Sequence, residues 1–179
     1  MSAAPVTVLL PGDYLFAEGH ARIQTLLGSC VAMVFWHPLR RIGCMCHFVL
    51  PWRLCSMQPD ARYADEFMRS LMKEVRARRT RPEDYEVRLY GAANMFRMLK
   101  TTCADSNQVD GVMLCPGCIS VSCRNRVAAH AEAAKHGFVV RDADLGGTAY
   151  RHVDFDVATG SVSVKTTPMA TFATLTSGT

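Results

Sequence analysis

Long apolar runs, a basic leader and a strong charge of either sign are all lacking in this sequence of 179 residues. No stretch approaches the roughly 20 apolar residues that a membrane-spanning helix needs. The opening MSAAPVTVLLPGDY has neither a basic segment nor a long apolar core, so it does not predict a signal peptide. The net charge of +4 is too small to favour nucleic acid as a partner. We therefore expect a cytoplasmic protein that neither inserts into membranes nor binds nucleic acid.

Internal repeats and low-complexity tracts are also absent. At 49% hydrophobic and 20% charged residues, the composition is that of an ordinary globular protein. A chain of this length can bury a substantial core, so we expect one domain over residues 1–179. The eight cysteines are expected to be free thiols, because thiols stay reduced in the cytoplasm. They are Cys30, Cys44, Cys46, Cys55, Cys103, Cys115, Cys118 and Cys123.

Apolar and alternating patterns predict a strand-rich chain with a few helices. Strands are expected at 6–10, 21–27, 31–36, 41–50, 86–91, 111–115, 138–141, 150–157 and 162–165. The four residues 37–40 favour an antiparallel hairpin between two of these runs. A four-residue apolar period from about residue 61 predicts an amphipathic helix. A second helix is expected to begin with Ser122 as its N-cap and to end at Gly137.

This mixture predicts an α/β or α+β fold with a sheet core. The stretch 167–179 shows no clear pattern, and we expect it to be loosely ordered.

The segment TLLGSCVAMVFW places Cys30 where a small-residue turn enters an apolar strand. Glycine tolerates positive φ and serine bonds its own backbone, so Gly28 and Ser29 favour a tight bend. The hairpin would bring Cys30 close to His47, which lies 17 residues further on. An imidazole beside a thiol can take its proton and produce a nucleophile, and open amides at Gly28 and Ser29 could hold an oxyanion. A buried cysteine and a structural histidine would fit the same pattern, so the residues alone leave both interpretations open.

The segment CPGC, formed by Cys115 and Cys118, offers a second chemistry. Cysteine thiolates at such spacing can hold zinc or cycle between thiol and disulfide. A strong zinc pattern pairs two similar knuckles, and only one is present here. A redox pair would need a strand followed at once by a helix, whereas Pro116 and Gly117 favour a turn. Free thiols are therefore the simpler interpretation.

Four segments in series resemble one protein family, the chemoreceptor glutamine deamidases (CheD) of bacterial chemotaxis. The family's Leu-Gly-Ser-Cys-Val turn, with a histidine 17 residues later that runs into Leu-Pro, matches residues 27–31, His47 and 50–51. RLYGAANMF at 88–96 is similar to its Phe-Gly-Gly-Ala-x-Met-Phe segment. The resemblance covers residues 5–166 and ends in two further matches, Arg124-Asn125 at a helix start and DADLGGTAYRHVDFDVATGSVSVK at 142–165. The chain departs from the family at Ala92, Ser122 and Tyr150, where glycine is common.

The resemblance implies a cysteine hydrolase with Cys30 as nucleophile, His47 as general base and a threonine as third member. Thr25 is the nearby threonine, although some members place theirs one residue further from the cysteine, which is Gln24 here. Neither a cofactor nor a metal is implied. The implied fold is a sheet-based sandwich with helices outside, similar to the deamidating cytotoxic necrotizing toxins.

The implied activity is hydrolysis of glutamine side chains on methyl-accepting chemotaxis receptors to glutamate through a thioester, and the family is also associated with receptor methyl ester hydrolysis. Two alternatives remain. The chain could act as a non-catalytic adaptor that binds receptors or a CheC-like phosphatase. It could instead be a zinc or thiol-redox protein that uses Cys115 and Cys118.

Overall fold

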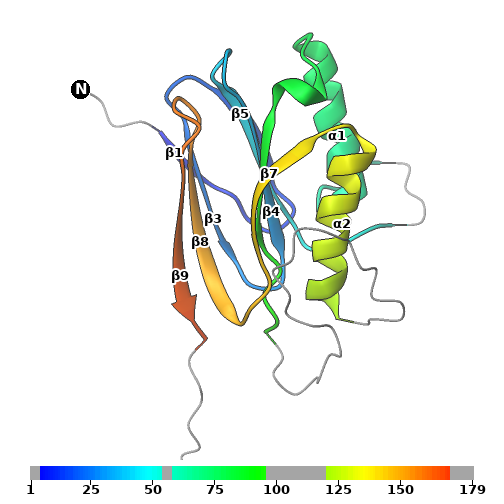
Figure 1. The fold of residues 1–179 in the computed structure, drawn as a ribbon, viewed down its shortest axis with the longest axis vertical. Coiled ribbons are helices and arrows are strands. Elements are labelled where there is room, and N and C mark those ends of the chain that lie inside the picture. Colours follow the sequence, from blue (N-terminus) through cyan, green and yellow to red (C-terminus); the bar gives the residue numbers. More distant parts are fainter. Residues whose placement is uncertain (1–4, 54–57, 96–119, 170–179) are drawn as a thin grey trace, which may run out of the picture.

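The computed structural model describes residues 5–53, 58–95 and 120–169. In this part of the chain two β-sheets pack together, and two helices cover one of them (Figure 1). The elements in chain order are β1 (Val6–Val8), β2 (Tyr14–Glu18), β3 (Arg22–Leu27), β4 (Val31–His37), β5 (Ile42–Phe48), α1 (Ala64–Ala77), the 3-10 turn η1 (Pro82–Asp84), β6 (Glu86–Gly91), α2 (Val121–Lys135), β7 (Val139–Leu145), β8 (Ala149–Asp156) and β9 (Val162–Pro168).

The two sheets differ in size and in what covers them. The larger has the strand order β2-β5-β4-β6-β7, and the smaller has the order β1-β3-β8-β9. Figure 1 shows α1 and α2 on the side of the larger sheet that faces away from the smaller one. The expected mixed α/β fold, built on sheets with helices outside, is confirmed at this level.

Strand β4 is apolar on both of its faces because each face contacts a different layer. Successive side chains of a strand point to opposite faces. Val31, Met33 and Phe35 therefore pack in the layer that faces the helices, whereas Ala32 and Val34 pack in the layer between the sheets. This double burial accounts for the continuous apolar run in the sequence.

The hairpin expected at residues 31–50 is confirmed, since β4 and β5 pair antiparallel with Ala32 opposite His47. Strand β6 has the predicted bounds. One strand, β2, was not predicted. It lies at the edge of the larger sheet, where its side chains are only partly covered and the apolar alternation is correspondingly weak.

The predicted start of the second helix is wrong by two residues. Ser120, in extended conformation, precedes the first helical residue of α2. Ser122 instead lies inside the helix, where it is buried and shares a hydrogen bond with Ser120, 2.9 Å between the two hydroxyl oxygens. Two serines two residues apart offer the same capping chemistry, so local sequence does not decide between them.

The stretch 167–179 was expected to be loosely ordered, and its first two residues are not. Strand β9 continues through Thr167 to Pro168 and pairs there with β8. The remainder of the predicted loose stretch, residues 170–179, lies outside the described residues, as do the strand expected at 111–115 and the CPGC segment. A single domain over 1–179 stays a prediction. No helix in the described ranges combines the length and the apolar character needed to cross a membrane.

Candidate functional site

Cys30 and His47 lie at one end of the β4–β5 hairpin, on the face that meets the smaller sheet. His47 on β5 pairs with Ala32 on β4, and Ala32 follows Cys30 by two residues. Ala32 belongs to the layer between the sheets, and Cys30 packs against this layer. Residues in this diagonal relation have Cα atoms about 7–8 Å apart, within reach of a histidine side chain. The expected approach of these two residues is therefore supported by the register.

Thr25 reaches His47 from the other sheet. Along β3 the side chains of Ile23, Thr25 and Leu27 are buried in turn, which directs Thr25 toward the larger sheet. Its Oγ1 lies 2.8 Å from Nδ1 of His47. Gln24 faces the opposite side of β3, where its Nε2 donates to Oδ2 of Asp154 at 2.8 Å. Of the two candidates for the third position, only Thr25 contacts His47.

The hydrogen bonds of Thr25 select one tautomer of His47. The hydroxyl lies 2.9 Å from the carbonyl oxygen of Leu9, which can only accept, so the single hydroxyl hydrogen goes there. Oγ1 must then accept from Nδ1–H of His47. This leaves Nε2 as the ring nitrogen with a free lone pair, and it makes no hydrogen bond to any described residue although it is buried. The arrangement is that of a histidine prepared to accept a proton at Nε2.

Hydrogen bonds also hold the backbone of His47. Its amide donates to the carbonyl of Asp13 at 2.9 Å, and its carbonyl accepts from the amide of Gly12 at 2.8 Å. Burial lowers the pKa of His47, against opposing contributions from the Leu9 carbonyl and the Asp13 charge. The net direction keeps the imidazole neutral at physiological pH.

Cys30 is half-buried, and burial raises the pKa of its thiol, partly offset by a hydrogen bond with the Ser29 side chain. With the pKa of the thiol raised and that of His47 lowered, both groups are neutral at rest, and Nε2 of His47 makes no hydrogen bond to a described residue. If Cys30 acts as a nucleophile, its thiol must lose the proton during the attack, because the thiolate is not formed beforehand.

We expect Cys30 in the resting protein to be alkylated by iodoacetamide more slowly at pH 7.5 than a free cysteine peptide. The reason is that the sulfur attacks only as its proton leaves, either beforehand or to a nearby base, and the raised pKa of Cys30 makes this loss harder. The rate should rise with pH and reach half its plateau above the midpoint of the peptide. Mass spectrometry of the Cys30 peptide after timed quenching measures both rates. A midpoint below that of the peptide would show a preformed thiolate and contradict the neutral pair.

The expected bend at Gly28 and Ser29 is confirmed, but it does not use a positive φ at Gly28. Gly28 has no positive φ, whereas Gly91 (φ 115°) and Ala92 (φ 53°) on the neighbouring segment do. That segment holds the cysteine turn, since the amide of Ala92 donates to the carbonyl of Cys30 at 2.7 Å and that of Ala93 to the carbonyl of Gly28 at 2.8 Å. A Cβ on Gly28 would lie 3.3 Å from Cγ of Met95, so this glycine serves close packing.

The carbonyls of the turn are bonded, but within the described residues its amides have no acceptor. No hydrogen bond from the amides of Ser29 or Cys30 to another described residue is found. Two free donors next to a thiol are what an oxyanion site requires.

We expect Gly91→Ala to be strongly destabilising. A Cβ at position 91 would lie 2.3 Å from the carbonyl oxygen of Cys30, and φ of 115° is unfavourable for alanine. The free energy of unfolding should fall by about 3 kcal/mol or more in urea denaturation. Gly19→Ala is the matched control, because Gly19 also has a positive φ (66°) but nothing lies within 4 Å of its added Cβ. Equal losses in the two variants would show that contact with Cys30 is unimportant.

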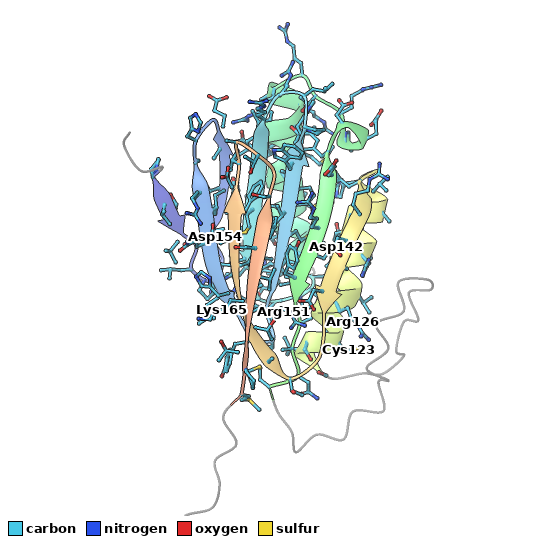
Figure 2. All side chains as sticks on the ribbon, turned by 60° about the vertical axis from the view of Figure 1, so that its left-hand side comes forward. Cys123, Arg126, Asp142, Arg151, Asp154 and Lys165 are labelled. Carbon is cyan, nitrogen blue, oxygen red and sulfur yellow. The ribbon has the colours of Figure 1, made fainter. Side chains whose placement is uncertain are left out.

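Arg151 supports the same region and was not singled out as a functional residue by its sequence. From β8 its guanidinium contacts the carboxylate of Asp144, the carbonyl of Gly146 at 2.9 Å and the carbonyl of Gly91 at 3.5 Å. Figure 2 shows Arg151 toward the same end of the molecule as Cys123 at the start of α2. In the sequence, only the position of Arg151 within the stretch 142–165 that resembles the family pointed to a role for it.

Two of the described cysteines, Cys44 and Cys46, lie on the other face of the larger sheet from Cys30. Cys44 and Cys46 are free, fully buried and packed in the layer that faces the helices, which confirms that they share one strand face. In residues 5–53, 58–95 and 120–169, no three His, Cys, Asp or Glu side chains are grouped as metal ligands would be. Cys115 and Cys118 lie outside the described residues, so their chemistry stays a prediction.

The fold and the site together define a two-sheet protein in which a cysteine turn and a histidine from one sheet meet a threonine from the other. Comparison with known proteins places it more narrowly. A family model described as CheD chemotactic sensory transduction matches residues 50–166, and the chain belongs to this family. The resemblance first seen in the motifs is thereby confirmed.

Relatives in several bacteria extend the match over most of the chain. A "Probable chemoreceptor glutamine deamidase CheD" of Pseudomonas savastanoi pv. phaseolicola is 43% identical over 163 residues, which covers 90% of this chain and 85% of the relative. Proteins of the same description in Pseudomonas fluorescens and Leptospira interrogans are 40% and 27% identical, covering 90% and 88% of this chain and 85% and 90% of theirs. Coverage of this extent necessarily includes the segment from Thr25 to His47.

Proposed function

We propose that this protein hydrolyses glutamine side chains of methyl-accepting chemoreceptors to glutamate in the cytoplasm, with Cys30 as nucleophile, His47 as general base and Thr25 as the residue that orients His47. The observation that carries the proposal is the hydrogen-bonded row from the Leu9 carbonyl through Thr25 Oγ1 to His47 Nδ1, which leaves Nε2 free next to a cysteine turn. Family membership supplies the substrate, since its named relatives are described as chemoreceptor glutamine deamidases.

The reaction follows from the protonation states of the resting pair. Sγ of Cys30 bonds to the carboxamide carbon of the glutamine while Nε2 of His47 takes the thiol proton and the carbonyl oxygen becomes an anion. The amides of Ser29 and Cys30, which donate to no described residue, are the donors that would hold this anion. When the carbonyl reforms, the C–N bond breaks and the imidazolium gives its proton to the leaving nitrogen, which departs as ammonia.

Hydrolysis of the thioester reverses these roles. His47 takes a proton from water, the resulting hydroxide adds to the thioester carbon, and the C–S bond breaks. The proton returns to the sulfur, which restores the thiol, and the product is a glutamate. The substrate change from amide to carboxylate adds one negative charge to the receptor. An ester substrate would pass through the same thioester, so methyl ester hydrolysis remains open to this site.

We expect Thr25→Val to lower kcat for deamidation by about 10- to 100-fold with little change in KM. Valine keeps the shape of threonine but lacks the hydroxyl, so the ring of His47 loses the partner that fixes its tautomer. Thr25→Ser, which keeps the hydroxyl, is the matched control and should retain most of the activity. Steady-state kinetics on one receptor fragment measures both. Equal rates for the valine variant and the wild type would remove Thr25 from the site.

The proposal is tested by mass spectrometry of a receptor cytoplasmic domain incubated with the purified protein. Defined glutamine peptides should gain the mass difference between an amide and an acid. Absence of any shift, with receptor binding retained, would favour the adaptor alternative, including an adaptor for a CheC-like phosphatase. Stoichiometric zinc in protein purified under reducing conditions would favour the metal alternative at Cys115 and Cys118.

A likeness of the sandwich to the deamidating cytotoxic necrotizing toxins belongs with this proposal. It rests on the family and on the placement of Cys30 and His47 between two sheets.

A further inference from the structure

Asn125, near the start of α2, joins the two chain segments that carry Cys30 and His47. Its side chain is fully buried. Its Nδ2 lies 2.8 Å from the carbonyl oxygen of Val49 and 3.1 Å from that of Ser29. Ser29 directly precedes Cys30, and Val49 follows His47 by two residues. One amide group therefore spans the nucleophile turn and the strand of the base.

The orientation of this amide is set by its partners. Both are carbonyl oxygens, which only accept, so the NH2 group must face them and uses both of its hydrogens. The side-chain oxygen Oδ1 then points away from them and makes no hydrogen bond to a described residue. A carboxylate in the same place would oppose both carbonyls, and a hydroxyl would provide one donor only.

The bridge lies where the strand ladder has ended. The last paired residues of β4 and β5 at this end are Val31 and Phe48. Beyond them the chains separate, because the amides of Val49 and Leu50 both donate to the carbonyl of Arg62 at 2.8 and 2.9 Å. Cys30 thus lies outside the ladder that fixes His47. Among the hydrogen bonds of the described residues, those of Asn125 are the ones that connect the two segments beyond that end.

We propose that Asn125 is a positioning residue that sets the distance and direction of Cys30 relative to His47. It acts through backbone carbonyls from the helix side of the sheet and does not touch the reacting atoms. The inference rests on the proposed function of the Cys30–His47 pair. It explains why an asparagine is buried at the start of a helix whose other buried positions are mostly small or apolar.

The test measures how strongly the alkylation of Cys30 depends on His47, which requires no receptor. Rates with iodoacetamide at pH 7.5 are compared for the wild type, H47N, N125A and the N125A/H47N pair. We expect H47N alone to slow alkylation about tenfold, because the base is lost, and to have no effect when N125A is already present. In N125A, kcat for deamidation should fall about 10- to 100-fold with KM unchanged.

Two further variants separate positioning from loss of stability. N125D keeps the volume of the side chain but has at most one donor. In N125D the dependence of Cys30 alkylation on His47 should therefore lie between that of the wild type and that of N125A. N125D replaces N125A in the test if N125A does not fold. T80V is the matched control, since Thr80 is a buried hydroxyl that contacts the Val75 carbonyl and the Tyr85 hydroxyl, and Tyr85 packs on His37 at the opposite end of β4. In T80V, alkylation of Cys30 should depend on His47 as strongly as in the wild type.

Each outcome decides the inference. Loss of the His47 dependence in N125A but not in T80V supports positioning by Asn125. The same dependence in N125A as in the wild type overturns it while leaving the proposed function intact. No dependence on His47 in the wild type overturns the pair itself, and the inference with it.

Discussion

Cys30→Ala is expected to reduce receptor deamidation by about ten-thousand-fold or more, to the limit of detection. In the proposed mechanism Sγ of Cys30 forms the thioester, and alanine removes this atom. The fold should survive, because Cys30 is half-buried at the end of a strand and its carbonyl, not its sulfur, holds the neighbouring segment. Mass spectrometry of receptor glutamines measures the activity, and urea denaturation measures the free energy of unfolding.

Cys44→Ala provides the control for this variant. Cys44 is a buried free thiol on β5, opposite Phe35 and in the layer that faces the helices. Its replacement should lower stability by about 1 kcal/mol and leave deamidation unchanged. Deamidation that persists in Cys30→Ala would remove Cys30 as the nucleophile, whatever the result for Cys44.

His47→Asn is expected to lower kcat by about 100- to 10,000-fold. Asparagine can still donate to Oγ1 of Thr25 as Nδ1 does, but it has no counterpart of Nε2, so the variant removes the base while keeping the bond across the sheets. Thiol attack would then depend on the small thiolate fraction, which is reduced further by the raised pKa of Cys30. Activity of the variant should consequently increase steeply with pH up to the pKa of the thiol. A flat pH profile with wild-type kcat would contradict a role for Nε2.

The wild type should stay active at lower pH than the His47→Asn variant. As the proposed general base, His47 would act only when unprotonated, and burial lowers its pKa below the usual value of about 6.5. The acidic limb of kcat/KM therefore belongs below that value, and mild acid should not inactivate the protein through this residue.

The sequence was sufficient for the hairpin, and therefore for placing Cys30 and His47 at the same end of it. A four-residue connection between two apolar runs leaves few registers, so two residues far apart in sequence can be placed on one strand pair. The choice between Thr25 and Gln24 could not be made in the same way. It depends on which face of β3 meets the larger sheet, and β3 is held by β8, with Thr25 opposite Val153. Local patterns carry no information on pairing at that separation.

Backbone conformation was the second limit. The bend at Gly28 and Ser29 forms as predicted, but the positive φ angles lie at Gly91 and Ala92 on the segment next to the turn. A glycine shows that such a conformation is permitted but not that it is used. Ala92 also adopts it, and an alanine gives no sign of this in the sequence. The role of Asn125 depends on two carbonyls from other segments and was equally out of reach.

The pairing of β3 with β8 determines when, during synthesis of the chain, Thr25 can be held opposite His47. A nascent chain exposes Cys30 and His47 long before it contains β8 at 149–156, and β1 is only three residues long. Such a short strand pair is too weak to hold Thr25 opposite the imidazole. The hydroxyl that selects the tautomer of His47 can be delivered only once most of the chain has been synthesised. The nascent chain thus contains Cys30 and His47 well before it contains the strand that holds Thr25 in place.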